Sequence, residues 1–172
     1  NKRTKAILGN SKTFTIMNKL EILKEQVARF EREAKKKIQI INGRPIYVGD
    51  LYPLRCSFLP DGLIVIGNLD VSHSLLSRLP NGLIVTGNLD IRNTRIEDFP
   101  SNTFVGGSIF MAKTKIEILP PHFVVRGDLL IDWKITKFPE SLTVCGNLDL
   151  TESEIKRIHS NVKVFGEILL KK

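Results

Sequence analysis

The chain has few of the residues that crosslink a fold or carry it into a membrane. It contains two cysteines in 172 residues, Cys56 and Cys145, too few for a disulfide framework. It has no stretch of 18 apolar residues, which argues against a membrane-spanning helix. The opening residues, Asn1–Thr4, are not followed by an apolar run and a cleavage site, so we expect no signal peptide. These absences favour a reducing compartment, the cytosol of a bacterium or of a host cell, and no contact with a membrane.

The chain also lacks the grouped side chains of an active site. Its three histidines have no cysteine pair or spaced carboxylates beside them that would complete a metal site: His73, His122 and His159. No catalytic constellation is recognisable. The sequence therefore predicts a protein that is not an enzyme and that uses no metal or cofactor.

Excess positive charge is missing from most of the chain. Residues 1–46 contain 12 Lys or Arg and 4 Asp or Glu, a net charge of +8, whereas residues 47–172 contain 14 of each sign. The difference predicts two parts, a basic N-terminal arm with a helix and a hairpin cap at 1–46 and a repeat region at 47–172.

A twenty-residue repeat fills the second part. Glycines and prolines both recur at intervals of 20, with one shared interval of 19 that marks a single deletion. The glycines are Gly67, Gly87, Gly107, Gly127, Gly146 and Gly166, and the prolines are Pro60, Pro80, Pro100, Pro120 and Pro139. Two markers that share one deletion are hard to obtain by chance, so we expect about seven stacked turns, the first degenerate and the last cut short.

Apolar residues keep the same register. Valine stands two residues before each glycine, and Leu, Ile, Val or Met stands two and four residues after it. Alternation on both sides of a glycine predicts two short strands with one buried face, joined at a bend or a close backbone approach. One turn alone buries too little apolar surface to fold, so the turns must stack into a solenoid. Asn68, Asn88 and Asn147 are expected to bond backbone groups at the bend.

Two segments carry a resemblance to a known family. Residues 59–71 read LPDGLIVIGNLDV and residues 79–91 read LPNGLIVTGNLDI. They resemble the short, twenty-residue class of bacterial leucine-rich repeats that occurs in secreted effector proteins and in proteins of bacterial viruses. The resemblance covers about 47–172 and implies recognition of another macromolecule, usually a protein. The recurrent Val-x-Gly-Asn-Leu departs from the common pattern, so we expect a short, fairly straight β-solenoid and not a horseshoe with outer helices.

Residues 16–34 predict an amphipathic helix. Its apolar residues are spaced 4, 3, 4, 3, 4: Ile16, Leu20, Leu23, Val27, Phe30 and Ala34. Thr13 or Thr15 would cap its start. We favour a helix that covers the open end of the stack, and the alternatives are a dimerising coiled coil or a partner-binding helix.

Two structures fit residues 38–48. Asn42-Gly43 between β-branched runs favours a hairpin with a tight turn. The competing interpretation continues the helix to Ile41 and ends it at Gly43. Either one would cover the first turn of the stack.

The column three residues after each glycine is predicted to face outward. Its members are Tyr52, Asp70, Asp90, Phe110, Leu130, Asp149 and Leu169. Its recurrent carboxylates could bind Ca²⁺, but we favour solvated side chains on a polar face. In the middle turns aspartate gives way to Phe110 and Leu130. Trp133 and Arg126 are near them in register, and Arg92 and Asp132 occupy the adjacent outward column.

Aromatic and arginine side chains on a repeated surface are typical of binding hot spots. We therefore hypothesise a protein-binding face made of Arg92, Phe110, Arg126, Leu130, Asp132 and Trp133. The alternative is that Phe110 and Leu130 turn inward. The size and the resemblance suggest an inhibitor from a bacterial virus, or an effector, that blocks a host enzyme or defence complex.

The basic arm suggests a second function class, nucleic-acid binding with the solenoid as scaffold. The candidate residues are Arg29, Arg32, Lys35, Lys36 and Lys37. No stacking aromatics lie between these charges and no nucleic-acid motif is present, so we favour the protein partner.

Overall fold

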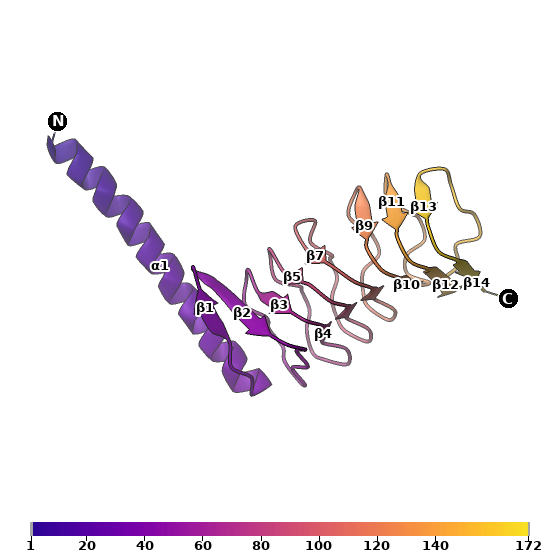
Figure 1. Ribbon diagram of the computed structural model, residues 1–172, viewed down its shortest axis with the longest axis horizontal. Helices are drawn as coiled ribbons and strands as arrows, with labels where there is room; N and C mark the ends of the chain where they lie inside the picture. The colour runs from indigo at the N-terminus through magenta and orange to yellow at the C-terminus, as the bar shows by residue number, and fades with distance from the viewer. Residues whose placement is uncertain (1, 172) are drawn as a thin grey trace.

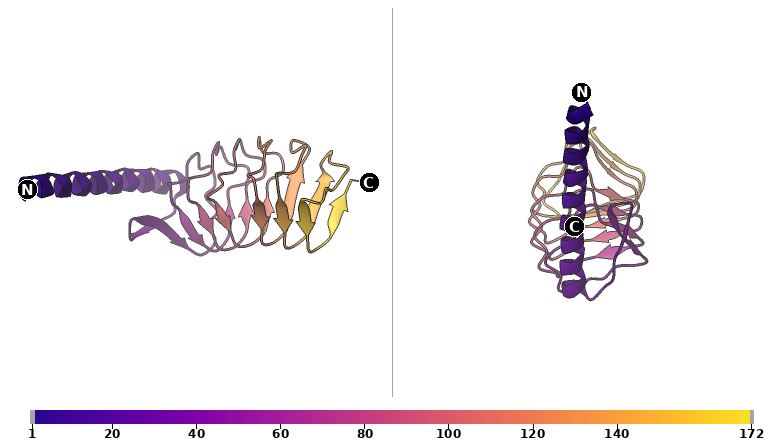
Figure 2. Two further views of the ribbon diagram at one scale, coloured as in Figure 1. Left: turned by 90° about the horizontal axis from the view of Figure 1, so that it is seen from above. Right: turned by 90° about the vertical axis from the view of Figure 1, so that its left-hand side faces the viewer.

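The computed structural model describes the backbone of residues 2–171 and the side chains of residues 18–171. One helix lies at the end of a stack of short strands (Figure 1). The stack is straight when viewed from above (Figure 2), and its described residues contain no helix. The chain therefore has the β-solenoid fold predicted from the repeat, with two strands per turn in place of outer helices.

The helix α1 (Lys2–Ala34) begins earlier than the predicted start at Ile16. Thr13 and Thr15 lie inside it and do not cap it, because Ala, Leu, Lys and Arg in the preceding residues favour the helix without an apolar stripe. The helix ends where Lys35 adopts a left-handed backbone, with φ 55°, and its N–H donates to the carbonyl of Glu31 at 3.1 Å.

A hairpin joins the helix to the solenoid, as the Asn-Gly pair predicts. Its strands β1 (Gln39–Ile41) and β2 (Arg44–Val48) pair antiparallel. Asn42 and Gly43 both have positive φ, 50° and 72°, which is the signature of a type I′ turn. The strand β2 then pairs parallel with β3 and so starts the first row of the solenoid.

The solenoid strands form two rows, which we call the first row and the second row. The first row consists of β2, β3 (Ile64–Ile66), β5 (Ile84–Val85), β7 (Phe104–Val105), β9 (Phe123–Val125), β11 (Leu142–Val144) and β13 (Val162–Val164). The second row consists of β4 (Leu69–Asp70), β6 (Leu89–Asp90), β8 (Ile109–Phe110), β10 (Leu129–Asp132), β12 (Leu148–Glu152) and β14 (Ile168–Leu170). In the degenerate first turn, an isolated bridge from Leu51 to Leu69 replaces the second-row strand.

Neighbouring turns pair parallel and one repeat apart, as Leu89 does with Ile109. At the deletion Leu129 pairs with Leu148, nineteen residues on, and the register then shifts by one residue, so that Asp132 pairs with Glu152. The second row is one continuous six-stranded sheet, whereas the first row is split into two sheets between β7 and β9.

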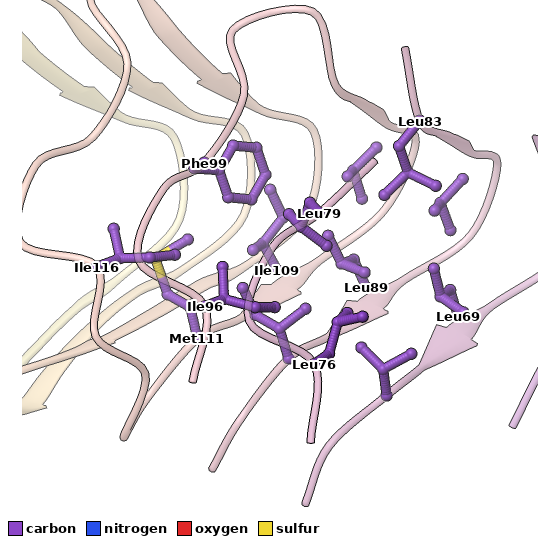
Figure 3. Close-up of a cluster of buried hydrophobic side chains, with 14 of the residues drawn as sticks. Leu69, Leu76, Leu79, Leu83, Leu89, Ile96, Phe99, Ile109, Met111 and Ile116 are labelled. Carbon is purple, nitrogen blue, oxygen red and sulfur yellow. The ribbon is translucent and has the colours of Figure 1, made fainter. Parts of the chain in front are cut away.

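The predicted apolar columns form one core. Side chains from the second row, from the segment after it and from the position before each proline point toward one another (Figure 3). Among them are Leu69, Leu89, Ile109, Ile96, Ile116, Leu79 and Phe99, all of them buried.

Two hydrogen-bond ladders hold the bend between the rows. From Gly87 onward, each repeat glycine donates its N–H to the carbonyl of the glycine one turn earlier, as Gly127 does to Gly107 at 3.0 Å. A Cβ on Gly127 would lie 2.6 Å from the nitrogen of Ser108 and 2.8 Å from the carbonyl carbon of Gly107. The close backbone approach predicted from the sequence is therefore present.

The second ladder confirms the role predicted for the asparagines. Asn68 accepts the N–H of Asn88 at 2.7 Å, Asn88 accepts that of Ser108 at 2.8 Å, and Asn147 accepts that of Glu167 at 2.8 Å.

The last third of α1 covers the first end of the core. Phe30 is fully buried, and Val27 and Ala34 are buried beside it, whereas Leu20 is 37% exposed and Ile22 50%. Glu33 accepts both the N–H and the hydroxyl of Ser57, at 2.9 and 2.8 Å, which ties the helix to the first turn. Burial raises the pKa of Glu33, but the hydrogen bonds from Ser57 and Arg29 outweigh it and leave the pKa below its usual value.

Candidate functional site

Phe110 and Leu130 lie side by side on the outer face of the second row. They are register partners in β8 and β10, and each is half-buried. The residues on either side of each are buried: Ile109, Met111, Leu129 and Ile131. Because side chains alternate along a strand, Phe110 and Leu130 point outward. The interpretation in which they turn inward is therefore wrong.

Arg92 covers one edge of this pair. Its guanidinium carbon lies 5.6 Å from the ring centroid of Phe110, a cation–π distance. Asp90 holds the guanidinium in place through contacts of 3.0 Å to Nε and 2.6 Å to one terminal nitrogen. The hydrogen bond to Asp90 raises the pKa of Arg92 above its ordinary value. The result is an aromatic ring with a fixed cation on it, in a column that carries Asp70, Asp90 and Asp149 in other turns.

The other three predicted residues, Trp133, Asp132 and Arg126, lie in three different environments. Trp133 is 57% exposed just after β10, with Lys134 Nζ 5.2 Å from its ring centroid. Asp132 was predicted to face outward, but it is buried because its carboxylate accepts the N–H groups of Lys113 and Lys134. Arg126 lies over Phe104 of the first row, 5.2 Å from the ring centroid, and not over Phe110. We therefore define the second-row patch as Arg92, Phe110, Leu130 and Trp133.

The recurrent aspartates shape turns. Each accepts the N–H two residues later: Asp70 from Ser72 at 2.9 Å, Asp90 from Arg92 at 3.0 Å and Asp149 from Thr151 at 2.9 Å. Within the described residues no group of three or more His, Cys, Asp or Glu side chains is arranged to hold a metal ion.

The basic arm is partly neutralised by its own carboxylates. Arg29 pairs with Glu33 at 3.0 Å, and Lys37 pairs with Glu31 at 2.9 Å. The hydrogen bond from Lys37, and after it the N–H of Ile38, lowers the pKa of Glu31. Arg32 and Lys35 are exposed, and Lys36 is half-buried. The five predicted residues thus do not form one uniformly basic surface.

An apolar face on the first row was missed from the sequence. Its outward column is made of Ile46, Ile64, Ile84, Phe104 and Val124. The signal was present, because three members, Ile64, Ile84 and Val124, each lie between two buried residues. The outward position of the middle residue is easily overlooked, because a run of three apolar residues resembles a strand that is buried on both faces.

The two cysteines differ in environment. Cys56 is buried in the first turn, and burial raises the pKa of its thiol to about 11, while Cys145 is exposed. Among the described residues, no helix is both long and apolar enough to cross a bilayer.

Fold and site together define a β-solenoid repeat protein with patterned outer faces. Comparison of the chain with protein-family models, with curated proteins and with solved structures found no match.

Proposed function

We propose that the protein is a non-enzymatic recognition module that binds a protein partner through the second-row patch. The observation that carries the proposal is the outward pair Phe110–Leu130, which lies between Asp90 and Asp149 in its column and carries Arg92 on its edge. A ring and a cation already held in place lose little conformational entropy on binding, which is the property of a hot spot. Trp133, more than half exposed, extends the patch.

Affinity capture from a cell lysate, followed by binding of the purified partner, tests this proposal. Phe110→Asp and Trp133→Ala should each weaken binding by about tenfold or more, since hot-spot aromatics contribute on that scale. Leu75→Asp is the matched control, because Leu75 is 58% exposed in a different column. A partner that both patch variants hold as tightly as the unchanged protein would exclude this face.

A narrower form of the proposal, an inhibitor of a host enzyme or defence complex, rests on the resemblance to repeats of effectors and bacterial viruses alone. Loss of the partner's activity on stoichiometric addition of the protein would support it. The nucleic-acid alternative remains a prediction from charge. It fails if duplex and single-stranded DNA both go unbound at ~50 mM salt, where phosphate contacts are strong.

A further inference from the structure

The first row presents a continuous apolar face that the rest of the described chain leaves open. Phe104 is 42% exposed and Val124 is 56% exposed, and three half-buried isoleucines extend the column: Ile46, Ile64 and Ile84. Ile66 and Val48, two residues further along their strands, are 48% and 71% exposed. Because paired neighbouring strands lie about 4.8 Å apart, the side chains from Ile46 to Phe104 form one surface and not scattered contacts, and Val124 continues the column on the next strand.

A cleft opens in this face where the first row is split. No strand pairing joins β7 to β9, and a cleft of about 210 Å³ lies between their turns, lined by Phe104, Phe123, Val124 and Arg126 among others. Thr103 also lines it, and its Oγ1 is buried with no hydrogen-bond partner among the described residues. A buried hydroxyl without a partner is unfavourable, so the cleft holds a polar atom that an incoming group could satisfy.

Basic side chains lie along this face. Arg126 lies over Phe104 and has no carboxylate within salt-bridge distance in the described chain. Arg44 donates to the carbonyl of Gly82 at 2.9 Å near the start of the column, and Lys163 ends it. His122, which also lines the cleft, lies 3.5 Å from the carboxylate of Glu140.

We propose that the first-row face binds an acidic, apolar segment of a partner protein. A large apolar side chain of that segment enters the cleft between β7 and β9, and a neighbouring carboxylate bonds Arg126. The exposed apolar column supplies the contact area. The unpaired guanidinium of Arg126 favours a segment with negative charge. A second copy of this chain fits less well, because a symmetric contact would bring Arg44, Arg126 and Lys163 against like charges. The site lies in a different row from the second-row patch, so its test does not depend on that proposal.

A random peptide library displayed on particles is the probe. Peptides are selected on the unchanged protein and counter-selected on Arg126→Glu. The selected peptides should combine large apolar residues with an excess of Asp and Glu. A synthetic copy should lose affinity by about tenfold in Arg126→Glu and in Val124→Asp, and should weaken as salt rises from ~50 to ~500 mM. Ile118→Asp, at a side chain 73% exposed elsewhere, is the matched control and should bind normally.

A peptide with a swapped charge shows whether Arg126→Glu loses affinity through a lost contact or through misfolding. A peptide with Lys in place of its key carboxylate should bind Arg126→Glu better than it binds the unchanged protein. The proposal is overturned if no peptide is enriched, if the enriched peptides carry no acidic excess, or if both variants bind them unchanged. It is also overturned if light scattering shows a dimer that Val124→Asp dissociates, because the occupant would then be a second copy.

Discussion

The outer faces of the two rows come from one repeat, yet they differ in chemistry. The second row carries Asp70, Asp90 and Asp149 around the pair Phe110–Leu130, whereas the first row presents aliphatic and aromatic side chains from Ile46 to Val124. The inner columns show no such difference, since both rows bury aliphatic side chains such as Leu and Val. Folding requires only the inner columns, so the difference between the outer faces is available for recognition.

The largest expected loss of stability comes from Phe30→Ala, because this change weakens the packing of α1 on the core that lies beneath both faces. Phe30 is fully buried between α1 and the first turn. Phe30→Ala should lower the free energy of unfolding by about 3–5 kcal/mol, from lost apolar burial and the cavity left behind. Urea unfolding followed by circular dichroism measures it. Ile22→Ala, half exposed on the same helix, is the control, and an equal loss in both would show that the helix does not cap the core.

A second change acts on the bend that joins the faces. In Gly127→Ala the new Cβ would meet backbone atoms of Ser108 and Gly107, which cannot move without opening the glycine ladder. We expect a loss of about 2–3 kcal/mol or more, measured by thermal unfolding. Gly43→Ala, in open space with φ +72°, isolates the backbone strain. If Gly43→Ala costs as much, close packing of the turns is not what requires glycine.

The strand pattern could be read from the sequence because packing dictates it. The Val and Leu columns, the Gly approach and the Asn ladder all follow from stacking identical turns, and Asn42-Gly43 specifies its own turn. Asp132 could not be placed from register, because its carboxylate turns in to bond the N–H groups of Lys113 and Lys134.

Two features of the first row could not be predicted, because they depend on how neighbouring turns contact one another. Arg126 lies over Phe104 one turn back, and this contact across turns has no sequence marker. The split between β7 and β9 is likewise invisible in the repeat, whose glycine and valine markers continue through it unchanged.

Acid should weaken the cap that both rows share. The pKa values of Glu31 and Glu33 are lowered from 4.5, so these carboxylates stabilise the fold above pH 4.5, and that stabilisation is lost as the pH falls through their folded-state pKa values. Glu33→Gln should cost about 1–2 kcal/mol at pH 7 and reduce the acid sensitivity of unfolding. Urea titrations at pH 7 and at ~pH 3.5 measure both. Glu25→Gln, exposed on the same helix, should behave as the unchanged protein at both pH values.

The smallest expected change in the free energy of unfolding comes from Thr103→Val, and this variant also distinguishes binding at one face from binding at the other. Thr103→Val keeps the shape of a side chain whose hydroxyl is buried without a partner, so it should raise the free energy of unfolding by up to about 1 kcal/mol. If the cleft binds an acidic segment that satisfies this hydroxyl, the same variant should bind that segment more weakly while it folds more stably. Binding through Phe110 should not change, because β8 belongs to the other row. Stability and first-row affinity that rise together would mean that the hydroxyl takes no part in recognition and that the cleft is only an imperfection in packing.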